Sequence, residues 1–188
     1  DEILLPQPYY SVYYISGLLT SAKIKFYNIN AETLEIDMDD FRSKYDPSKT
    51  KIVVMCSPGN PYGSLITDSL YKEVIDMTSD RTFIVSDEIY RNTGFDGRVP
   101  SILDHASDSE LQRIIVTNAF SKGFRMYTAR VGFSILPTAL LEPMRVLLQH
   151  TLLTTNPCEQ FACVEALNHL EEVEELTKIY KTRNDYTV

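Results

Sequence analysis

Residues 51–63, KIVVMCSPGNPYG, join a short apolar run to a turn rich in proline and glycine. The run KIVVMC has the length and the β-branched composition of a strand, and SPGNPYG marks its end. Helical patterns lie on both sides of this strand in the sequence, which is typical of a parallel sheet covered by helices. The stretch therefore predicts a strand that leads directly into a polar turn at one edge of such a sheet.

Further short apolar runs alternate with helical patterns along the 188 residues. Thr67, followed by Asp68, has the side chain expected at the N-cap of one of these helices. The repeated order of strand and helix indicates an α/β fold with a mostly parallel sheet and helices on both faces, in three layers α/β/α. The further strands are expected near residues 3–5, 23–27, 82–86, 113–117 and 130–135, and the helices near 9–20, 37–45, 67–78 and 137–153.

The C-terminal residues 157–186 carry apolar side chains three or four positions apart, which predicts one long amphipathic helix or two helices in succession. The chain begins inside an apolar run and ends inside a charged helical pattern, so we expect both ends to continue in a longer protein. We predict a domain core over residues 1–156, incomplete at its N-terminal side, and a helical segment over residues 157–188 that leads towards a second domain.

The composition argues against two classes of partner. The 18 lysines and arginines are outnumbered by 26 aspartates and glutamates, the net charge is −8, and no basic run is present to neutralise nucleic-acid phosphates. No apolar stretch approaches the roughly 20 residues of a membrane span, and the start DEILLPQP does not resemble a signal peptide. We expect a soluble protein of the cytoplasm that binds neither nucleic acid nor a membrane.

The cysteines and histidines do not form a metal-binding pattern. Cys56, Cys158 and Cys163 have no CxxC spacing and cannot all pair, which predicts buried free thiols in a reducing compartment. The three histidines are scattered, and no two of them are spaced i, i+4. We therefore predict no metal site.

Polar side chains follow three of the expected strands at the points where these strands end. Because ligands of open parallel sheets bind beyond the carboxyl ends of the strands, these side chains are the first candidates for a site. An amide, a carboxylate, a phenol and an ammonium are expected to meet there, those of Asn60, Asp87, Tyr90 and Lys122. Each has an ordinary explanation alone, such as a turn for Asn60 or a helix cap for Asp87, but the combination favours a catalytic site.

Lys122, Arg130 and Asp87 supply the groups that pyridoxal phosphate requires. A lysine can form an imine with the aldehyde of this cofactor when neighbouring charges or burial make its neutral amine accessible. An arginine can hold the phosphate with two parallel hydrogen bonds. A carboxylate beside the pyridine nitrogen keeps this nitrogen protonated, which makes the ring an electron sink.

Four ordered segments resemble the signatures of one enzyme family. The segments LPQPYYSVY at 5–13, SPGNPYG at 57–63, SDEIY at 86–90 and SKGFRMYTAR at 121–130 are similar to those of the class I/II aminotransferases, the fold-type I pyridoxal-phosphate enzymes. The resemblance covers nearly the whole chain. It implies the central part of the large, cofactor-binding domain of this fold, without the small domain that supplies an arginine for the substrate carboxylate.

The resemblance implies roles for single residues. Lys122 matches the lysine that forms the internal aldimine and then moves the proton between the substrate and the cofactor. Asp87 matches the partner of the pyridine nitrogen. Tyr90 and Asn60 match the two groups that bind the ring hydroxyl.

Further matches concern the phosphate and the face of the cofactor ring. Arg130 resembles the phosphate-binding arginine, and Ser121 is expected to add a hydroxyl donor. The position three before the lysine, often a phosphate-binding serine in the family, is Ala119 here. Tyr10 lies where the family places the aromatic ring that stacks on the cofactor, with its neighbour Tyr9 as the alternative.

The resemblance implies a pyridoxal-phosphate-dependent aminotransferase that transfers an amino group from an amino acid to a 2-oxo acid and works as a homodimer in its full-length form. The isolated chain is expected to be inactive and to bind the cofactor weakly. A lyase or a cyclopropane-forming, ACC-synthase-like enzyme on the same scaffold is an alternative, and so is a truncated scaffold without catalysis. A nucleotide-binding ATPase is disfavoured, because FIVSDE at 83–88 resembles a Walker B strand but no GxxxxGK[ST] loop precedes it.

Overall fold

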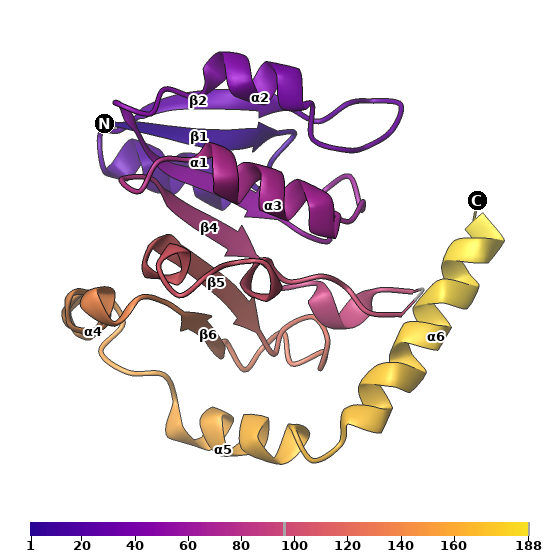
Figure 1. Cartoon of the computed structure of the whole chain (residues 1–188). Coiled ribbons are helices and arrows are strands. Elements are labelled where there is room, and N and C mark those ends of the chain that lie inside the picture. The colour runs from indigo at the N-terminus through magenta and orange to yellow at the C-terminus, as the bar shows by residue number, and fades with distance from the viewer. Residues whose placement is uncertain (96, 188) are drawn as a thin grey trace.

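A single sheet organises the part of the chain that the computed structural model describes, residues 1–95 and 97–187. These residues form a six-stranded sheet in the order β2-β1-β3-β4-β5-β6 (Figure 1). The strands β1 to β5 are parallel to their neighbours, whereas β6 runs antiparallel to β5, so the predicted mostly parallel sheet is confirmed. The strands are β1 (Glu2–Gln7), β2 (Lys23–Asn28), β3 (Thr50–Cys56), β4 (Phe83–Asp87), β5 (Ile114–Ala119) and β6 (Gly132–Ile135).

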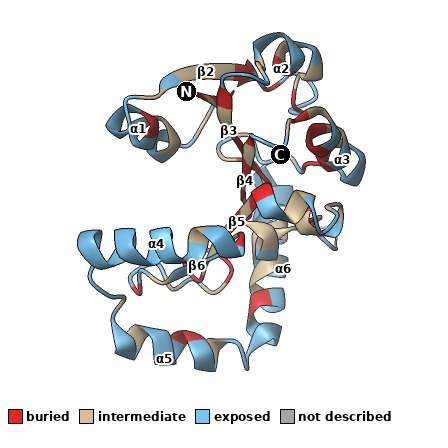
Figure 2. Ribbon diagram, turned by 60° about the vertical axis from the view of Figure 1, so that its left-hand side comes forward, coloured by how far each residue is buried: buried red, intermediate tan, exposed pale blue. Residues whose placement is uncertain are grey.

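Helices form where the sequence pattern predicts them. The helix α1 (Ser11–Leu19) lies on one face of the sheet, and α2 (Met38–Lys44) and α3 (Asp68–Met77) lie on the other (Figures 1 and 2). Thr67 caps α3 as expected, because its hydroxyl accepts a hydrogen bond from the backbone N–H of Leu70. The C-terminal pattern forms two helices in succession. The remaining elements are α4 (Thr138–Thr151), α5 (Pro157–Ala166), α6 (Leu170–Thr187) and the 3-10 turns Arg91–Thr93, Ile102–Asp104 and Glu110–Arg113.

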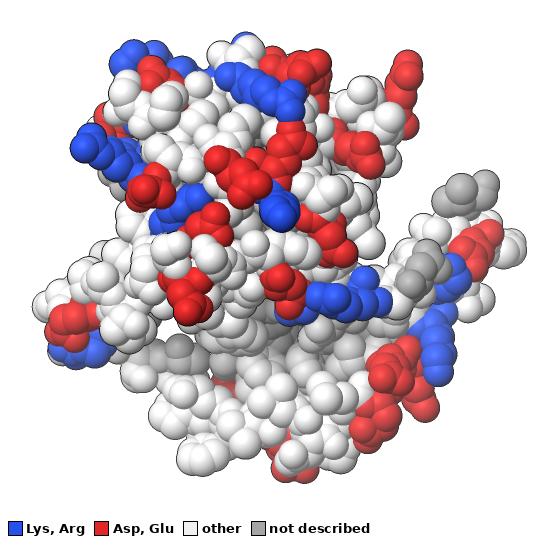
Figure 3. Space-filling view, in the orientation of Figure 1, with Lys and Arg blue, Asp and Glu red and all other residues white. Residues whose placement is uncertain are grey.

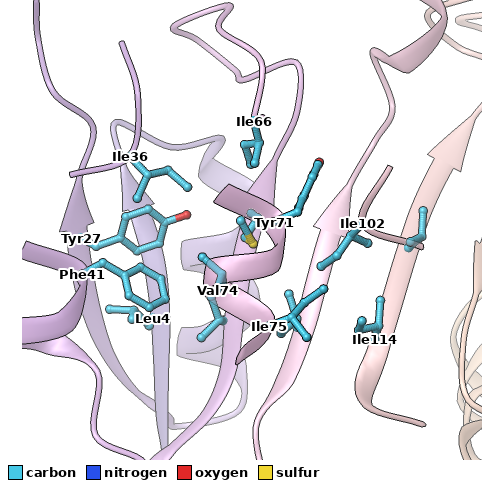
Figure 4. Packing of buried hydrophobic residues seen from close by; sticks show 14 of the residues in the cluster. Leu4, Tyr27, Ile36, Phe41, Ile66, Tyr71, Val74, Ile75, Ile102 and Ile114 are labelled. Carbon is cyan, nitrogen blue, oxygen red and sulfur yellow. The ribbon is translucent and has the colours of Figure 1, made fainter. Parts of the chain in front are cut away.

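The core lies between the sheet and the helices α2 and α3. Tyr27, Phe41 and Tyr71 are fully buried there, and branched side chains of the strands pack around them (Figure 4). The Tyr27 hydroxyl donates a hydrogen bond to the carbonyl oxygen of Val54 at 2.8 Å, so its burial leaves no donor unpaired. Each buried aromatic side chain removes about 150–250 Å² of surface from water, so these rings hold α2 and α3 on the sheet.

The helices cover the β6 side of the sheet less completely than the rest of it. Every residue of β6 is exposed, and so are most residues of α4 and α5 (Figure 2). The exposed side chains include the large apolar ones of Phe133, Leu147 and Phe161. In Figure 3 charged side chains gather over α2 and α3 and along α6, whereas much of the surface below them is uncharged. Among the described residues, helices thus cover both faces of the sheet at β1 and β2, and such covering is lacking at β6.

One cysteine differs from the prediction of buried thiols. Cys56 and Cys163 are buried, but Cys158 is exposed, because the first turn of α5 turns this position to solvent. All three are free thiols. None of the described helices has the length and apolar character needed to cross a membrane. The described residues also contain no group of three or more His, Cys, Asp or Glu side chains that could hold a metal ion.

Candidate active site

The carboxyl ends of β3, β4 and β5 meet at one edge of the sheet, where the register pairs Cys56 with Asp87 and Asp87 with Thr117. The loops that follow these ends carry Asn60, Tyr90, Ser121 and Lys122. Because β6 runs antiparallel to β5, its first residue Gly132 lies at the same edge, and Arg130 stands two positions before it. Residues that the sequence analysis selected on four separate segments are therefore brought to one edge.

Asp87 ends β4, and both of its carboxylate oxygens accept hydrogen bonds. Oδ1 accepts from the backbone N–H of Ile89 at 3.1 Å, and Oδ2 accepts from the Tyr13 hydroxyl at 2.5 Å. Burial raises the pKa of Tyr13 well above its ordinary value, and the neighbouring Cys56 and Asp87 raise it further. This phenol therefore remains a hydrogen-bond donor. Each carboxylate oxygen has a second lone pair, so Asp87 can accept a further donor from a ligand.

Two adjacent tyrosines precede α1 and take different positions. The Tyr10 ring packs edge-on against the Tyr13 ring, with 5.8 Å between the ring centroids, and Tyr10 is 45% exposed. The Tyr9 ring instead stacks on Phe26 of β2, with 5.2 Å between the centroids. Tyr10 and Tyr9 are the two candidates for the aromatic side chain that stacks on a cofactor ring. Of these, Tyr10 is the one that contacts Tyr13, the hydrogen-bond partner of Asp87.

Asn60, Tyr90 and Lys122 form a second group at this edge. The Asn60 side-chain amide donates a hydrogen bond to the Tyr90 hydroxyl at 3.4 Å. The Lys122 Nζ lies 5.5 Å from the centroid of the Tyr90 ring, within the range of cation–π attraction. Burial, together with the nearby Asp87, raises the pKa of the Cys56 thiol to about 11, so this thiol adds no charge to the edge at neutral pH.

Arg130 and Ser121 flank the loop that carries Lys122. The Arg130 backbone has a φ of +55°, which is uncommon for a residue with a side chain, and its Nη1 donates to the carbonyl oxygen of Tyr127 at 3.1 Å. Ser121 is buried, and its hydroxyl makes no hydrogen bond to the described residues. Within the described chain, neither Lys122 nor Arg130 forms an ion pair with a carboxylate. Two cations without carboxylate partners and a free hydroxyl are suited to binding an anion.

The chain has relatives among known proteins. The family model described as aminotransferase class I and II matches residues 1–188. This chain belongs to the class I and II aminotransferase family. An aspartate aminotransferase of Pyrococcus abyssi is 29% identical over 188 residues, which cover 97% of this chain and 48% of that relative. A (5-formylfuran-3-yl)methyl phosphate transaminase of Methanocaldococcus jannaschii is 29% identical over 174 residues, which cover 93% of this chain and 44% of that relative.

Solved aminotransferase structures share the fold. The aromatic aminotransferase of Pyrococcus horikoshii superimposes with a TM-score of 0.91 at 28% identity, covering 99% of this chain and 51% of that structure. The family predicted from the four sequence segments is thus confirmed, and the ATPase alternative is wrong. The chain spans about half the length of the aminotransferases that it matches.

The end of β5 departs from the pattern of many aminotransferases. The residue three before the lysine is Ala119, which has no side-chain donor, and the Oδ1 of its neighbour Asn118 accepts from the Ala119 backbone N–H at 2.7 Å. Across the sheet, a Cβ placed on Gly132 would lie 3.1 Å from the Asn118 carbonyl oxygen and 3.3 Å from the Ala119 Cβ. Small residues on both strands therefore let β5 and β6 approach closely just before the Lys122 loop.

Glu88, which follows Asp87 in the segment SDEIY, has a structural role. Its Oε1 accepts from the Ser86 hydroxyl at 3.2 Å, the Ser101 hydroxyl at 2.9 Å and the Ile102 backbone N–H at 3.1 Å. The side chain is buried, and this burial raises its pKa. Glu88 therefore ties the segment around Ser101 to the end of β4 and supports the site without belonging to it.

A cavity of about 570 Å³ opens beside Asn60 and Tyr90 of this aminotransferase chain. Residues of the turn after β3 and of the segment after β4 line it, together with one residue of α6. Asp87, Lys122 and Arg130 do not line this cavity. Of the candidate residues, only Asn60 and Tyr90 therefore border this cavity.

The sequence analysis did not single out Tyr13, although a signal for it was present. Tyr13 lies three positions after Tyr10, the N-cap residue of α1, so the two side chains are close enough to pack together.

Tyr13→Phe in the full-length protein should lower kcat/KM about 10- to 100-fold at neutral pH, because a hydrogen bond to a charged group contributes about 1.5–3 kcal/mol. Steady-state kinetics would check this, with Tyr14→Phe as the matched control on the same helix. Wild-type kcat/KM in both variants would show that Tyr13 does not support Asp87.

Proposed function

We propose that this chain is the cofactor-binding half of a pyridoxal-phosphate-dependent aminotransferase that moves an amino group from an amino acid to a 2-oxo acid. The observation that carries the proposal is the position of the Lys122 amine, 5.5 Å from the centroid of the Tyr90 ring and without a carboxylate partner in the described chain. An amine at such a position is not held in an ion pair and can react with an aldehyde. Membership of the family supports the reaction type.

Residues at the edge fit the ring of pyridoxal phosphate. This cofactor supplies an electron sink for the charge that remains when the substrate loses a proton. Asp87 would hold the ring nitrogen, because each of its oxygens can accept one more hydrogen bond. Asn60 and Tyr90 would bind the ring hydroxyl, and Tyr10 would cover one face of the ring.

Arg130 and Ser121 would supply hydrogen-bond donors for the phosphate of the cofactor. Arg130 would bind it as a bidentate cation, since its guanidinium contacts only a backbone carbonyl among the described residues. Ser121 would add its free hydroxyl. With Ala119 at the end of β5, the chain offers no third side-chain donor at that position.

Lys122 would act twice in the reaction. Its Nζ would hold the cofactor through the aldehyde group. As a free amine, the same Nζ would take the proton from the α-carbon of the substrate as a general base and return it as a general acid. Asn60 and Tyr90 would keep the ring hydroxyl in place.

The organisation of the whole protein is part of the same proposal. Residues 1–156 would form the core of the cofactor-binding domain, and residues 157–188 would lead to a further domain that binds the substrate carboxylate. We propose a homodimer in the cytoplasm, and the exposed apolar side chains of β6, α4 and α5 support burial of this surface in the full-length protein. The isolated chain should then bind the cofactor weakly and be inactive.

A screen of amino acids tests the reaction type. The full-length protein loaded with pyridoxal phosphate should convert it to pyridoxamine phosphate with an accepted amino acid and release an equimolar amount of the 2-oxo acid. The names of the relatives suggest aspartate and the aromatic amino acids as the first to try. Consumption of an amino acid without pyridoxamine phosphate would indicate a lyase or a cyclopropane-forming enzyme instead. No conversion with any amino acid would favour a scaffold without catalysis.

A further inference from the structure

The Lys122 amine lies between two tyrosine rings, and only one of them belongs to the site described above. The Nζ atom is 5.5 Å from the centroid of the Tyr90 ring and 5.6 Å from that of the Tyr127 ring. Both distances fall within the roughly 6 Å over which an aromatic ring attracts an ammonium group. Tyr127 comes from the same loop as Lys122, so this loop folds back over its own amine.

Tyr127 is held in place through its backbone, because its carbonyl oxygen accepts a hydrogen bond from the Arg130 Nη1 at 3.1 Å. Its side chain lies near Tyr180 of α6, and this neighbour, together with burial, raises the pKa of Tyr127. The phenol therefore stays neutral at physiological pH, and its ring keeps its attraction for a cation.

The helix that carries Tyr180 is itself fixed beside the site. The Thr177 hydroxyl of α6 donates to the carbonyl oxygen of Asn92, at 3.2 Å, in the 3-10 turn that follows Tyr90. Figure 1 shows α6 passing alongside the segment that follows β4. The helix that carries Tyr180 is thus anchored next to the Tyr90 ring.

We propose that Tyr127 is a positioning residue that holds the Lys122 amine against the Tyr90 ring. The inference rests on the proposed function, because the position of the amine matters where Lys122 receives the cofactor. A lysine side chain is long and flexible, so an amine without the second ring would spend more time in solvent and attack the aldehyde less often.

The test measures how fast Lys122 reacts in the full-length protein freed of cofactor. Brief labelling with acetic anhydride and peptide mass spectrometry should show a rise in acetylation of Lys122 in Tyr127→Leu of about two- to fivefold, the factor that one cation–π contact at a half-exposed site supplies. Tyr127→Phe keeps both rings and should give a smaller change. Tyr186→Leu, on an exposed part of α6, is the matched control and should leave the labelling of Lys122 unchanged.

A second readout follows the cofactor. The rate at which added pyridoxal phosphate becomes fixed to Lys122 by borohydride should fall about two- to fivefold in Tyr127→Leu and recover in Tyr127→Phe. Unchanged labelling of Lys122 in Tyr127→Leu would overturn the inference, even where the cofactor still attaches to Lys122 and the proposed function stands. Increased labelling of many lysines together with a lowered Tm would overturn it as well, because Tyr127 would then act on folding. Changed labelling without any cofactor on Lys122 would support the contact and refute the proposed function.

Discussion

Asp87→Asn in the full-length protein should lower kcat by about 10²–10³-fold, the range that one preorganised charged or polar group supplies to a developing charge. Asparagine has nearly the same volume and can accept a hydrogen bond from Tyr13 or from the Ile89 backbone, so the edge should keep its shape. It cannot keep a proton on the pyridine nitrogen, because its amide carries no negative charge. The substrate should still bind, so we expect KM to change far less than kcat.

Kinetics with an amino donor deuterated at its α-carbon would check this expectation. Proton removal becomes slower when the electron sink is weakened, so the isotope effect on kcat should be larger in Asp87→Asn than in the wild type. Asp80→Asn, an exposed carboxylate in the turn before β4, is the matched control and should keep the wild-type kcat. Near-normal turnover of Asp87→Asn would show that the ring nitrogen does not depend on Asp87.

Lys122→Ala should lower kcat by about 10⁴-fold or more, at the upper end of what one acid–base group contributes. The loss is large because the same amine binds the cofactor covalently and moves the proton. Lys122→Arg retains a cation at this position but cannot form the covalent bond, so it should be nearly as inactive. Lys72→Ala, which removes an exposed lysine of α3, is the control. A kcat in Lys122→Ala above about a tenth of the wild-type value would mean that another group moves the proton.

Strand and helix positions were predictable because the apolar runs are short and bounded by turn residues. The run KIVVMC at 51–56 corresponds to β3 (Thr50–Cys56), and Thr67 acts as the N-cap that its side chain suggests. The direction of β6 was not predictable from RVGFSI, since the alternation of side chains is the same in parallel and antiparallel strands. It depends on the pairing of β6 with β5, which brings Arg130 to the same edge as Lys122.

The candidate site was predictable where its residues follow strand ends. Its tertiary contacts were not, because they join segments that are far apart in the chain. Tyr13 and Asp87 are separated by 74 positions and meet because α1 begins just after β1, at the edge of the sheet where β4 also ends. Tyr180 of α6 raises the pKa of Tyr127, and no local pattern records this pair. The choice between Tyr9 and Tyr10 also depends on a residue that is distant in the sequence, because the Tyr9 ring stacks on Phe26 of β2.

Net charge proved to be a poor guide to the ligand. The chain carries a formal charge of −8, yet the edge that we assign to the cofactor phosphate contains two cations without carboxylate partners among the described residues. Some acidic residues are paired elsewhere, as in the ion pairs of Glu2 with Lys23 and Lys25. Local arrangement, and not the overall balance, determines where an anion can bind.

Covalent attachment of pyridoxal phosphate to Lys122 is the most direct measurement. The full-length protein is loaded with the cofactor, reduced with borohydride, digested and analysed by mass spectrometry. We expect the cofactor mass on the peptide that contains Lys122 and its complete loss in Lys122→Ala, while Lys72→Ala behaves as the wild type. Attachment to a different lysine, or a borohydride-fixed cofactor that persists in Lys122→Ala, would contradict the assignment of Lys122.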